Sequence, residues 1–260
     1  MRTRKTGPDD IPALTALWAR AFGDTDAEIG RFFDTAYPES TGFCAEEDGA
    51  VVAMLFALPL TLAHDEETQK AAYLYAVATD EAFRGRGICR ALMEFAEKTL
   101  RKRYLSCLLL VPETEKLAAY YETMGYARQD SCAVQTLRAD APQGAAAVVT
   151  PQEYAGLRET LLFDVPHARY SKSQLDYAAE DLDLYRLEQG YAFGCAAVRR
   201  EGQIVEELLP DARMLPALAA ALGAGSYPVR MPGRGTMGCM AKWLDTEKQT
   251  APIWLAFDFD

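Results

Sequence analysis

The sequence contains very little histidine. Only two of its 260 residues are histidines, His64 in a charged segment and His167 close to a proline. A Ser-His-Asp site needs histidine as its base, and many metal sites use histidine as a ligand. The composition therefore gives little support to a serine hydrolase or to a histidine-ligated metal, and we expect no metal.

Paired cysteines are also missing. The six cysteines lie far apart and mostly inside apolar segments, at Cys44, Cys89, Cys107, Cys132, Cys195 and Cys239. None of them shows the C-x-x-C spacing that is typical of zinc or redox sites. We expect reduced thiols in the core.

Long apolar runs and an excess of positive charge are absent as well. No stretch approaches the roughly 20 apolar residues that cross a bilayer. Met1–Lys5 leads into Gly-Pro-Asp-Asp instead of the apolar centre of a signal peptide. We therefore expect a soluble, cytoplasmic protein that binds no membrane. The net charge of −11 also argues against nonspecific binding of nucleic acid, which requires clustered lysine and arginine.

The most informative segment is residues 73–104, where an apolar, strand-like run turns into an amphipathic helix. The turn contains Gly85 and Gly87, which allow a close approach of the backbone. The apolar face of the helix is marked by Ile88, Leu92, Phe95 and Thr99. A helix that starts after such a turn directs unpaired N–H groups and its positive end at one point. The segment therefore predicts a site for a phosphate-containing ligand.

Two common phosphate-binding loops do not fit this turn. A nucleotide P-loop closes with Gly-Lys-Ser/Thr, and neither the lysine nor the hydroxyl is present, which argues against an ATPase. In a dinucleotide fingerprint that begins Gly85-x-Gly87, the third glycine would be Arg90, whose side chain obstructs close helix–strand packing. A nicotinamide or flavin site is thus disfavoured. The pattern that remains is Arg/Gln-x-x-Gly-x-Gly/Ala.

In this pattern the chain resembles the GNAT family of acyl-CoA-dependent acetyltransferases. The matching phrase is Arg84-Gly85-Arg86-Gly87-Ile88-Cys89, in which Cys89 replaces the family's glycine or alanine. An apolar strand at Cys107–Val111 and the phrase Ala118–Tyr126 follow, as the family's Ala…Tyr-Glu-x-x-Gly-Phe/Tyr ending requires. The resemblance extends from about residue 3 to about residue 137. The run at Tyr73–Thr79 also looks like the subgroup related to the enhanced-intracellular-survival acetyltransferases.

The resemblance implies an α/β fold with an α+β mixed sheet in a GNAT domain at residues 1–140. The first helix is expected to be capped by Asp9 or Asp10, and a hairpin is expected at Asp48-Gly49. The patterns predict helices at 11–22 and 26–37, strands at 42–46, 51–63 and 71–79, and a polar loop at 64–70.

A change toward small residues, proline and glycine at 140–145 predicts a short linker before a second lobe at 146–260. The predicted elements are helices at 151–162 and 212–222 and strands at 182–187, 191–198, 203–209, 227–231 and 253–257. This order echoes the first lobe but lacks R-x-x-G-x-G. We interpret it as a degenerate GNAT-like lobe that shapes the acceptor pocket and binds no coenzyme A; an unrelated α+β domain is the alternative.

The resemblance also implies a co-substrate, acetyl-CoA, and roles for particular residues. The pantetheine arm would pair with backbone on the strand before the turn, and the pyrophosphate would lie on the turn. The expected cofactor-binding residues are Val77, Ala78, Thr79, Arg84, Gly85, Arg86, Gly87, Ile88, Cys89 and Arg90. Tyr121, four residues before Gly125, matches the tyrosine that protonates the departing thiolate. The alternative is that Tyr121 or Tyr120 only packs.

The general base is left open by the sequence. Glu46, Glu47, Asp80, Glu81 or water are candidates, and by analogy with the subgroup so are the carboxylates of the acidic ending at 257–260. An acetyl-cysteine mechanism through Cys89 or Cys107 is less favoured than direct transfer in a ternary complex.

The sequence thus predicts an N-acetyltransferase that acts on a primary amine of a small molecule. Two alternatives remain: acetylation of a protein N-terminus or lysine, and a non-catalytic module that senses acyl-CoA. The acceptor and the oligomeric state are not readable from the sequence.

Overall fold

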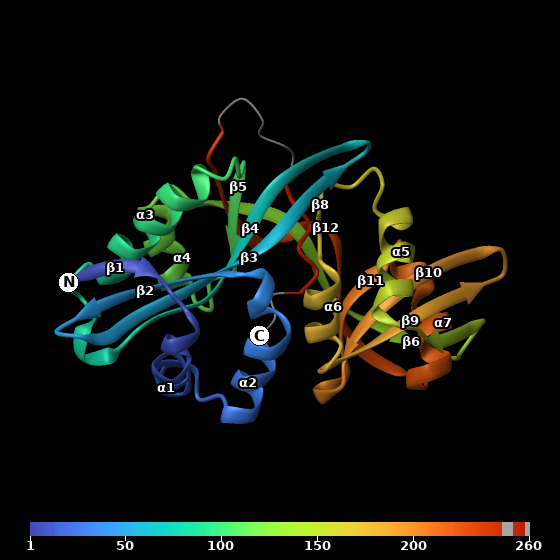
Figure 1. Ribbon diagram of the computed structural model, residues 1–260. Helices are drawn as coiled ribbons and strands as arrows, with labels where there is room; N and C mark the ends of the chain where they lie inside the picture. Colours follow the sequence, from blue (N-terminus) through green and yellow to red (C-terminus); the bar gives the residue numbers. More distant parts are fainter. Residues whose placement is uncertain (246–251, 258–260) are drawn as a thin grey trace. The chain divides into compact units, whose positions relative to one another are not determined.

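The computed structural model describes residues 1–245 and 252–257, which divide into two compact units (Figure 1). Among the described residues, the first unit comprises 1–60, 69–127 and 241–245, and the second comprises 61–68, 128–240 and 252–257. Within the described ranges, no helix is both long and apolar enough to cross a membrane.

The first unit is a mixed sheet with helices. Its helices are α1 (Ile11–Phe22), α2 (Asp26–Thr35), α3 (Ile88–Arg101) and α4 (Glu115–Glu122), and its strands are β1 (Arg2–Lys5), β2 (Thr41–Glu47), β3 (Ala50–His64), β4 (Glu67–Thr79) and β5 (Cys107–Leu110). The strands lie in the order β1-β2-β3-β4-β5. The pairs β1/β2 and β2/β3 are antiparallel, whereas β4 and β5 are parallel.

An aromatic cluster packs α1 and α2 against β3 and β4. The ring of Trp18 on α1 lies 5.0 Å from Phe32, 5.6 Å from Phe56 and 5.4 Å from Tyr75, measured between ring centroids. Trp18 is on the apolar face of α1, as the helical period predicts, and α1 ends at Gly23, whose φ of 86° suits glycine. This cluster fixes β4, the strand that leads into the predicted phosphate-binding turn.

The predicted hairpin is confirmed, but two other local predictions are wrong. Asp48 and Gly49 both have positive φ, 50° and 83°, and Glu47 pairs with Ala50 across this two-residue turn. The segment 64–70 is not a polar loop, because β3 and β4 continue through it to a tight turn at 65–66. Strand pairing satisfies the backbone there whatever the polarity of the side chains. Asp10 stands at the start of α1, but its carboxylate binds Arg4 and the amide of Gly7 instead of capping that helix.

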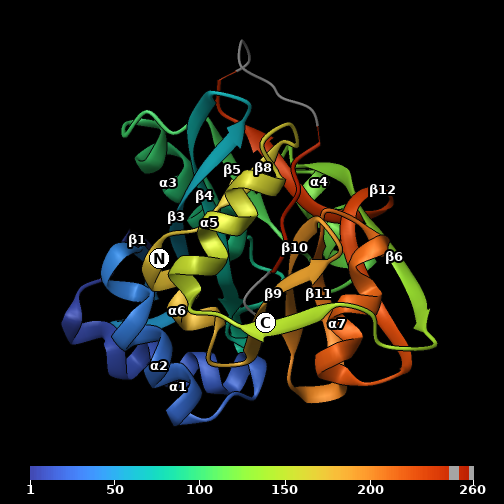
Figure 2. The same ribbon diagram turned by 90° about the vertical axis from the view of Figure 1, so that its right-hand side faces the viewer.

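The second unit is also a mixed sheet with helices (Figure 2). Its strands are β6 (Ala127–Ala139), β7 (Ala145–Val148), β8 (His167–Arg169), β9 (Leu182–Gln189), β10 (Ala192–Arg199), β11 (Ile204–Leu209) and β12 (Gly225–Trp243), and its helices are α5 (Pro151–Leu161), α6 (Lys172–Ala178) and α7 (Leu215–Leu222). The order is β12-β11-β10-β9-β7, with β6 paired to β12. The strands β6, β7 and β8 and the helix α6 have no counterpart in the sequence prediction. The strand predicted at 253–257 is wrong, because that segment forms only an isolated bridge between Trp254 and His167.

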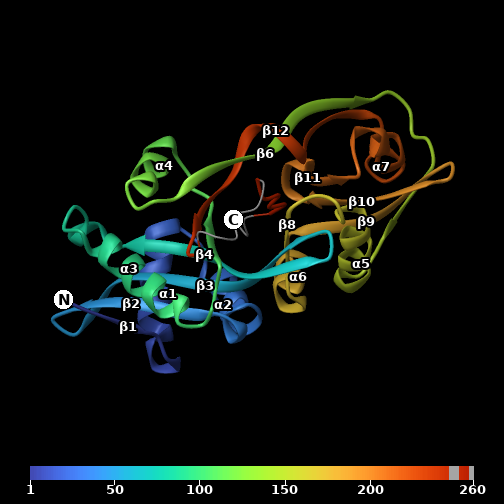
Figure 3. The same cartoon turned by 90° about the horizontal axis from the view of Figure 1, so that it is seen from above.

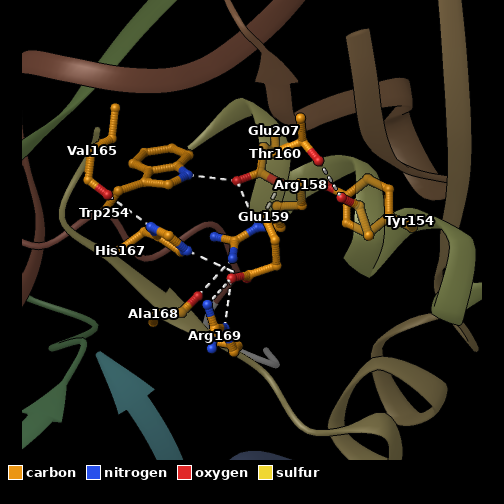
Figure 4. Close-up of polar contacts among 11 residues, drawn as sticks. Tyr154, Arg158, Glu159, Thr160, Val165, His167, Ala168, Arg169, Glu207 and Trp254 are labelled. Atoms are coloured by element: carbon orange, nitrogen blue, oxygen red, sulfur yellow. Dashed lines mark hydrogen bonds and ion pairs between the residues drawn. The ribbon is translucent and has the colours of Figure 1, made fainter. Parts of the chain in front are cut away.

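A buried ion pair joins α5 to β11 in the second unit (Figure 4). The side chains of Arg158 and Glu207 are only 2% and 0% exposed, and Arg158 Nε donates to Glu207 Oε2 at 2.9 Å. Glu207 also accepts from the hydroxyl of Tyr154 and, at 2.5 Å, from the indole N–H of Trp254. These bonds satisfy the buried carboxylate and hold the segment 252–257 to the core of its unit.

The two units share one succession of elements but differ at one loop. In the first unit β4 is followed by a short 3-10 helix, Glu81–Phe83, which Asp80 caps by accepting from the amide of Ala82. In the second unit β11 is followed by a 3-10 helix, Ala212–Met214, which Asp211 caps through the amide of Arg213. Residues 84–87 separate the first 3-10 helix from α3, whereas the second continues directly into α7. The second unit therefore lacks the glycine-bearing turn.

Candidate functional site

The glycine-bearing turn lies on the surface of the first unit, between β4 and α3. We call residues 84–90 the anion loop. Residues 84–87 are all exposed, and Gly85 and Gly87 both have a φ of 76°. A Cβ at either glycine would meet no other atom within 4 Å, so the left-handed backbone, and not crowding, explains why glycine stands there.

The amides of the anion loop point to a ligand. The first helical hydrogen bond of α3 runs from the amide of Ala91 to the carbonyl of Gly87, at 3.0 Å. The amides of residues 85–89 donate no hydrogen bond to any described residue, whereas the amide of Arg90 donates to the Tyr120 hydroxyl. α3 is 14 residues long, so its positive end adds to these donors. Unpaired amides at the start of a helix bind phosphate oxygens.

Two arginines of the anion loop are held by residues outside it. Arg84 Nε donates to the carbonyl oxygen of Thr79 at 3.1 Å, which closes the loop onto the end of β4. Arg86 forms an ion pair with Glu47 at the end of β2, and its guanidinium lies 5.3 Å from the centre of the Phe83 ring. The loop conformation is thus supported by β2 and β4.

The start of α3 and the end of α4 are joined directly, and both helices can be followed in Figure 3. Arg90 donates to Thr123 Oγ1 at 2.6 Å and to the Thr123 carbonyl at 3.3 Å. Its guanidinium lies 5.8 Å from the centre of the Tyr120 ring, and the Tyr120 hydroxyl is hydrogen-bonded to the Cys89 thiol. The structure therefore brings the α4 tyrosines next to the anion loop.

The two tyrosines of α4 differ in burial. Tyr121 is 6% exposed, and its burial, followed by the proximity of Cys89 and Tyr120, raises its pKa. Tyr120 is less buried, and its burial and its contact with Cys89 raise its pKa to about 12. Both phenols are protonated at neutral pH, as a proton donor must be. Burial also raises the pKa of the Cys89 thiol, which makes it a poor nucleophile.

The end of β4 offers backbone that β5 does not use. The pairs between β4 and β5 stop at Tyr73↔Leu109, although β4 continues to Thr79. Ala76 has a φ of 48°, which is unusual for a residue other than glycine and interrupts the strand geometry. The Thr79 hydroxyl oxygen is buried and has no partner in the described part of the chain. The pairing with β5 therefore ends before Val77, Ala78 and Thr79.

The candidate bases are mostly engaged in ion pairs. Glu46 accepts from Arg4 Nε at 2.8 Å, and Asp80 accepts from Arg20 Nη2 at 2.8 Å. In each case the hydrogen bond from the arginine lowers the pKa of the carboxyl. A lowered pKa weakens a base.

The remaining candidate bases are Glu47, Glu81 and the acidic ending of the chain. Glu47 is paired with Arg86, and Glu81 is exposed. The acidic ending at 258–260 lies outside the described residues. No group of three or more histidine, cysteine, aspartate or glutamate side chains is arranged for a metal ion in the portion of the chain that the structure describes.

A family model for the acetyltransferase (GNAT) domain matches residues 2–128. No curated protein sequence matches the chain.

Several solved structures are similar over nearly the whole chain. A probable N-acyltransferase from Enterococcus faecalis has a TM-score of 0.75 and 16% identity, with 94% of this chain and 72% of that chain covered. Eis1 from Mycobacterium abscessus has a TM-score of 0.66 and 14% identity, with coverage of 95% and 75%. A putative acetyltransferase from Pyrococcus horikoshii has a TM-score of 0.62 and 14% identity, with coverage of 98% and 94%. These likenesses confirm the predicted fold class.

Proposed function

Because the chain belongs through residues 2–128 to the GNAT acetyltransferase family, we propose that it transfers the acetyl group of acetyl-CoA to a primary amine. The observation that carries the proposal is the anion loop, in which the amides of residues 85–89 have no acceptor among the described residues and lie at the start of α3. The pyrophosphate of acetyl-CoA is the acceptor that we assign to them. In this proposal residues 1–140 form the acetyltransferase domain.

The donor would lie along the end of β4. Its pyrophosphate binds the backbone of residues 85–90, and its pantetheine arm pairs with the backbone of Val77, Ala78 and Thr79. The unpartnered hydroxyl of Thr79 supports this placement, because a buried hydroxyl without a partner is costly and an amide of the arm would satisfy it.

Transfer would proceed directly within a ternary complex. The amine nitrogen attacks the thioester carbonyl carbon, and the tetrahedral intermediate then expels the thiolate of coenzyme A. Tyr121 gives its phenolic proton to that thiolate, and the proton lost by the amine passes to water or to a carboxylate. The raised pKa of Tyr121 supports this role, because the phenol enters the reaction protonated.

The second lobe, residues 146–260, is proposed to shape the acceptor pocket without contacting coenzyme A. The direct junction between its 3-10 helix and α7 supports the absence of a donor site. We propose a small-molecule amine as acceptor, and the net charge of −11 would attract its cationic form.

Calorimetric titration with coenzyme A tests the proposal. Gly87→Glu places a side chain and a negative charge in a left-handed position of the anion loop, so we expect at least a tenfold loss of affinity. Gly190→Glu is the matched control, because Gly190 also has a positive φ with open space around it. Equal affinity of Gly87→Glu and the wild type would refute the site. A panel of amines, assayed for release of the coenzyme A thiol, then identifies the acceptor.

A further inference from the structure

We infer that Glu47 is a gate residue that competes with the donor's pyrophosphate for Arg86. This inference rests on the proposed function, since it concerns the same loop. Arg86 stands between the two glycines of the anion loop, and its guanidinium is bound by the Glu47 carboxylate. A carboxylate is therefore already present where an anionic ligand is expected to bind.

The position of Glu47 is fixed by the hairpin. Glu47 is the last residue of β2 and pairs with Ala50, directly before the tight turn at Asp48-Gly49. The preceding residue, Glu46, is instead bound by Arg4 on β1. Of these two adjacent carboxylates, Glu47 is thus the one held beside the anion loop.

The ion pair of Glu47 is incomplete. One carboxylate oxygen binds Arg86, whereas the other, Oε2, is buried and has no partner in the portion of the chain that the structure covers. The Glu47 side chain is 20% exposed and cannot relax freely into water, but the Arg86 side chain is 49% exposed and has room to turn toward a ligand. Arg86 is therefore the mobile partner and Glu47 the fixed one.

This asymmetry gives the pair a function. A pyrophosphate that recruits Arg86 must take it from Glu47 and must also approach a carboxylate of the same sign. Both effects oppose binding, so only an anion of high charge displaces Glu47. The gate would select the pyrophosphate of a coenzyme over singly charged cellular anions.

If Glu47 had only a positioning role, its loss would change the affinity for coenzyme A in the opposite direction. If Glu47 only held Arg86 in its binding conformation, its loss would weaken the binding of coenzyme A. If Glu47 competes for Arg86, its loss strengthens binding. The affinity of one variant therefore decides between the two roles.

The experiment is a calorimetric titration of coenzyme A into the wild type, Glu47→Gln and Asp48→Asn. We expect Glu47→Gln to bind about 3- to 10-fold more tightly, the scale of a partly exposed ion pair. Asp48→Asn removes the same charge one residue away, and Asn tolerates the positive φ at this position, so its affinity should stay within about twofold. Unchanged or weaker binding by Glu47→Gln would overturn the gate.

Two further measurements make the result specific. In an Arg86→Gln background, Glu47→Gln should increase the affinity for coenzyme A by a smaller factor, because no guanidinium remains to be released. Pantetheine, which carries no phosphate, should bind wild type and Glu47→Gln equally. If Glu47→Gln does not fold, Glu47→Asp, whose shorter side chain withdraws the carboxylate from Arg86, carries the same expectation.

The outcomes separate this inference from the proposed function. If the wild type binds no coenzyme A, both are wrong. If the wild type binds coenzyme A, Gly87→Glu binds it at least tenfold more weakly, and Glu47→Gln binds it no more tightly than the wild type, the donor site is supported and only the gate is wrong.

Discussion

At the scale of single residues, removal of the Tyr121 hydroxyl tests the proposed proton transfer to the departing thiolate. Tyr121→Phe keeps the ring that packs against Tyr120 and Tyr126, so the melting temperature and the affinity for acetyl-CoA should hardly change. Loss of a general acid typically lowers turnover by roughly 10²- to 10⁴-fold, and we expect a fall of this size with the best amine found.

Tyr120→Phe is the matched control for that prediction. It removes a neighbouring hydroxyl, the one hydrogen-bonded to Cys89, from the same helix. A large fall in turnover for Tyr120→Phe with nearly normal turnover for Tyr121→Phe would mean that the acid is the adjacent residue. Normal turnover for both would favour protonation by water.

Single residues also show what the sequence could predict of the site. The anion loop depends on local backbone conformation, so its glycines and the following helix were predictable from the order of residues alone. The partners of its arginines were not. Arg86 meets Glu47 and Arg90 meets Thr123, and each pair is brought together only by the fold. Glu47, one of the candidate bases in the sequence, forms an ion pair with Arg86 in the structure.

At the scale of secondary-structure elements, Glu159 links α5 to β8. Burial raises the pKa of Glu159, but hydrogen bonds from His167 and Arg169 outweigh it and lower the pKa to about 2. A carboxylate with a depressed folded pKa stabilises the fold above its unfolded pKa of about 4.3, and this stabilisation is lost as the pH falls toward 2. Acid should therefore weaken the contact between α5 and β8.

Denaturant unfolding at pH 6 and pH 3 measures this effect. The wild type should lose about 1–2 kcal/mol more of its unfolding free energy than Glu159→Gln over that interval. Glu188→Gln, at an exposed ion pair, should behave like the wild type. An identical pH dependence of Glu159→Gln and the wild type would contradict the assignment.

The buried pair between α5 and β11 gives another prediction at this scale. Arg158→Met leaves the Glu207 carboxylate buried without its cation, which should lower the free energy of unfolding by about 3–5 kcal/mol. The double variant Arg158→Met, Glu207→Gln keeps an acceptor for Trp254 without the buried charge, and it should recover part of the loss. A double variant less stable than the single one would show that the charge is not the cause.

Elements were predictable where their signals are local. The capped helix at 151–161 and the Asp48-Gly49 hairpin follow from a few neighbouring residues, and both are present. The polar segment 64–70 was misjudged, because side-chain polarity says little about a strand whose neighbour satisfies its backbone. β12 was predicted only in part, since its 19 residues include glycines and prolines that interrupt the strand pattern.

At the scale of the whole molecule, the absence of an anion loop between the second 3-10 helix and α7 predicts one coenzyme site per chain. Calorimetry should give a stoichiometry of one for the wild type, and Gly87→Glu should bind coenzyme A at least tenfold more weakly. A wild-type stoichiometry of two, of which Gly87→Glu loses only one site, would point to a site in the second unit. NAD and ATP should not compete with coenzyme A.

The exposure of residues 84–87 has an evolutionary consequence. These residues bury no side chain in the core, so a related domain can lose them without losing its hydrophobic interior. The shared order of strand, aspartate-capped 3-10 helix, helix and parallel strand is what duplication of an ancestral domain would leave behind. After such a duplication, one copy is released from selection for ligand binding and becomes free to diverge as a scaffold. Such a copy would keep the fold but lose ligand binding, and the loss of a single surface turn would be enough to cause this difference.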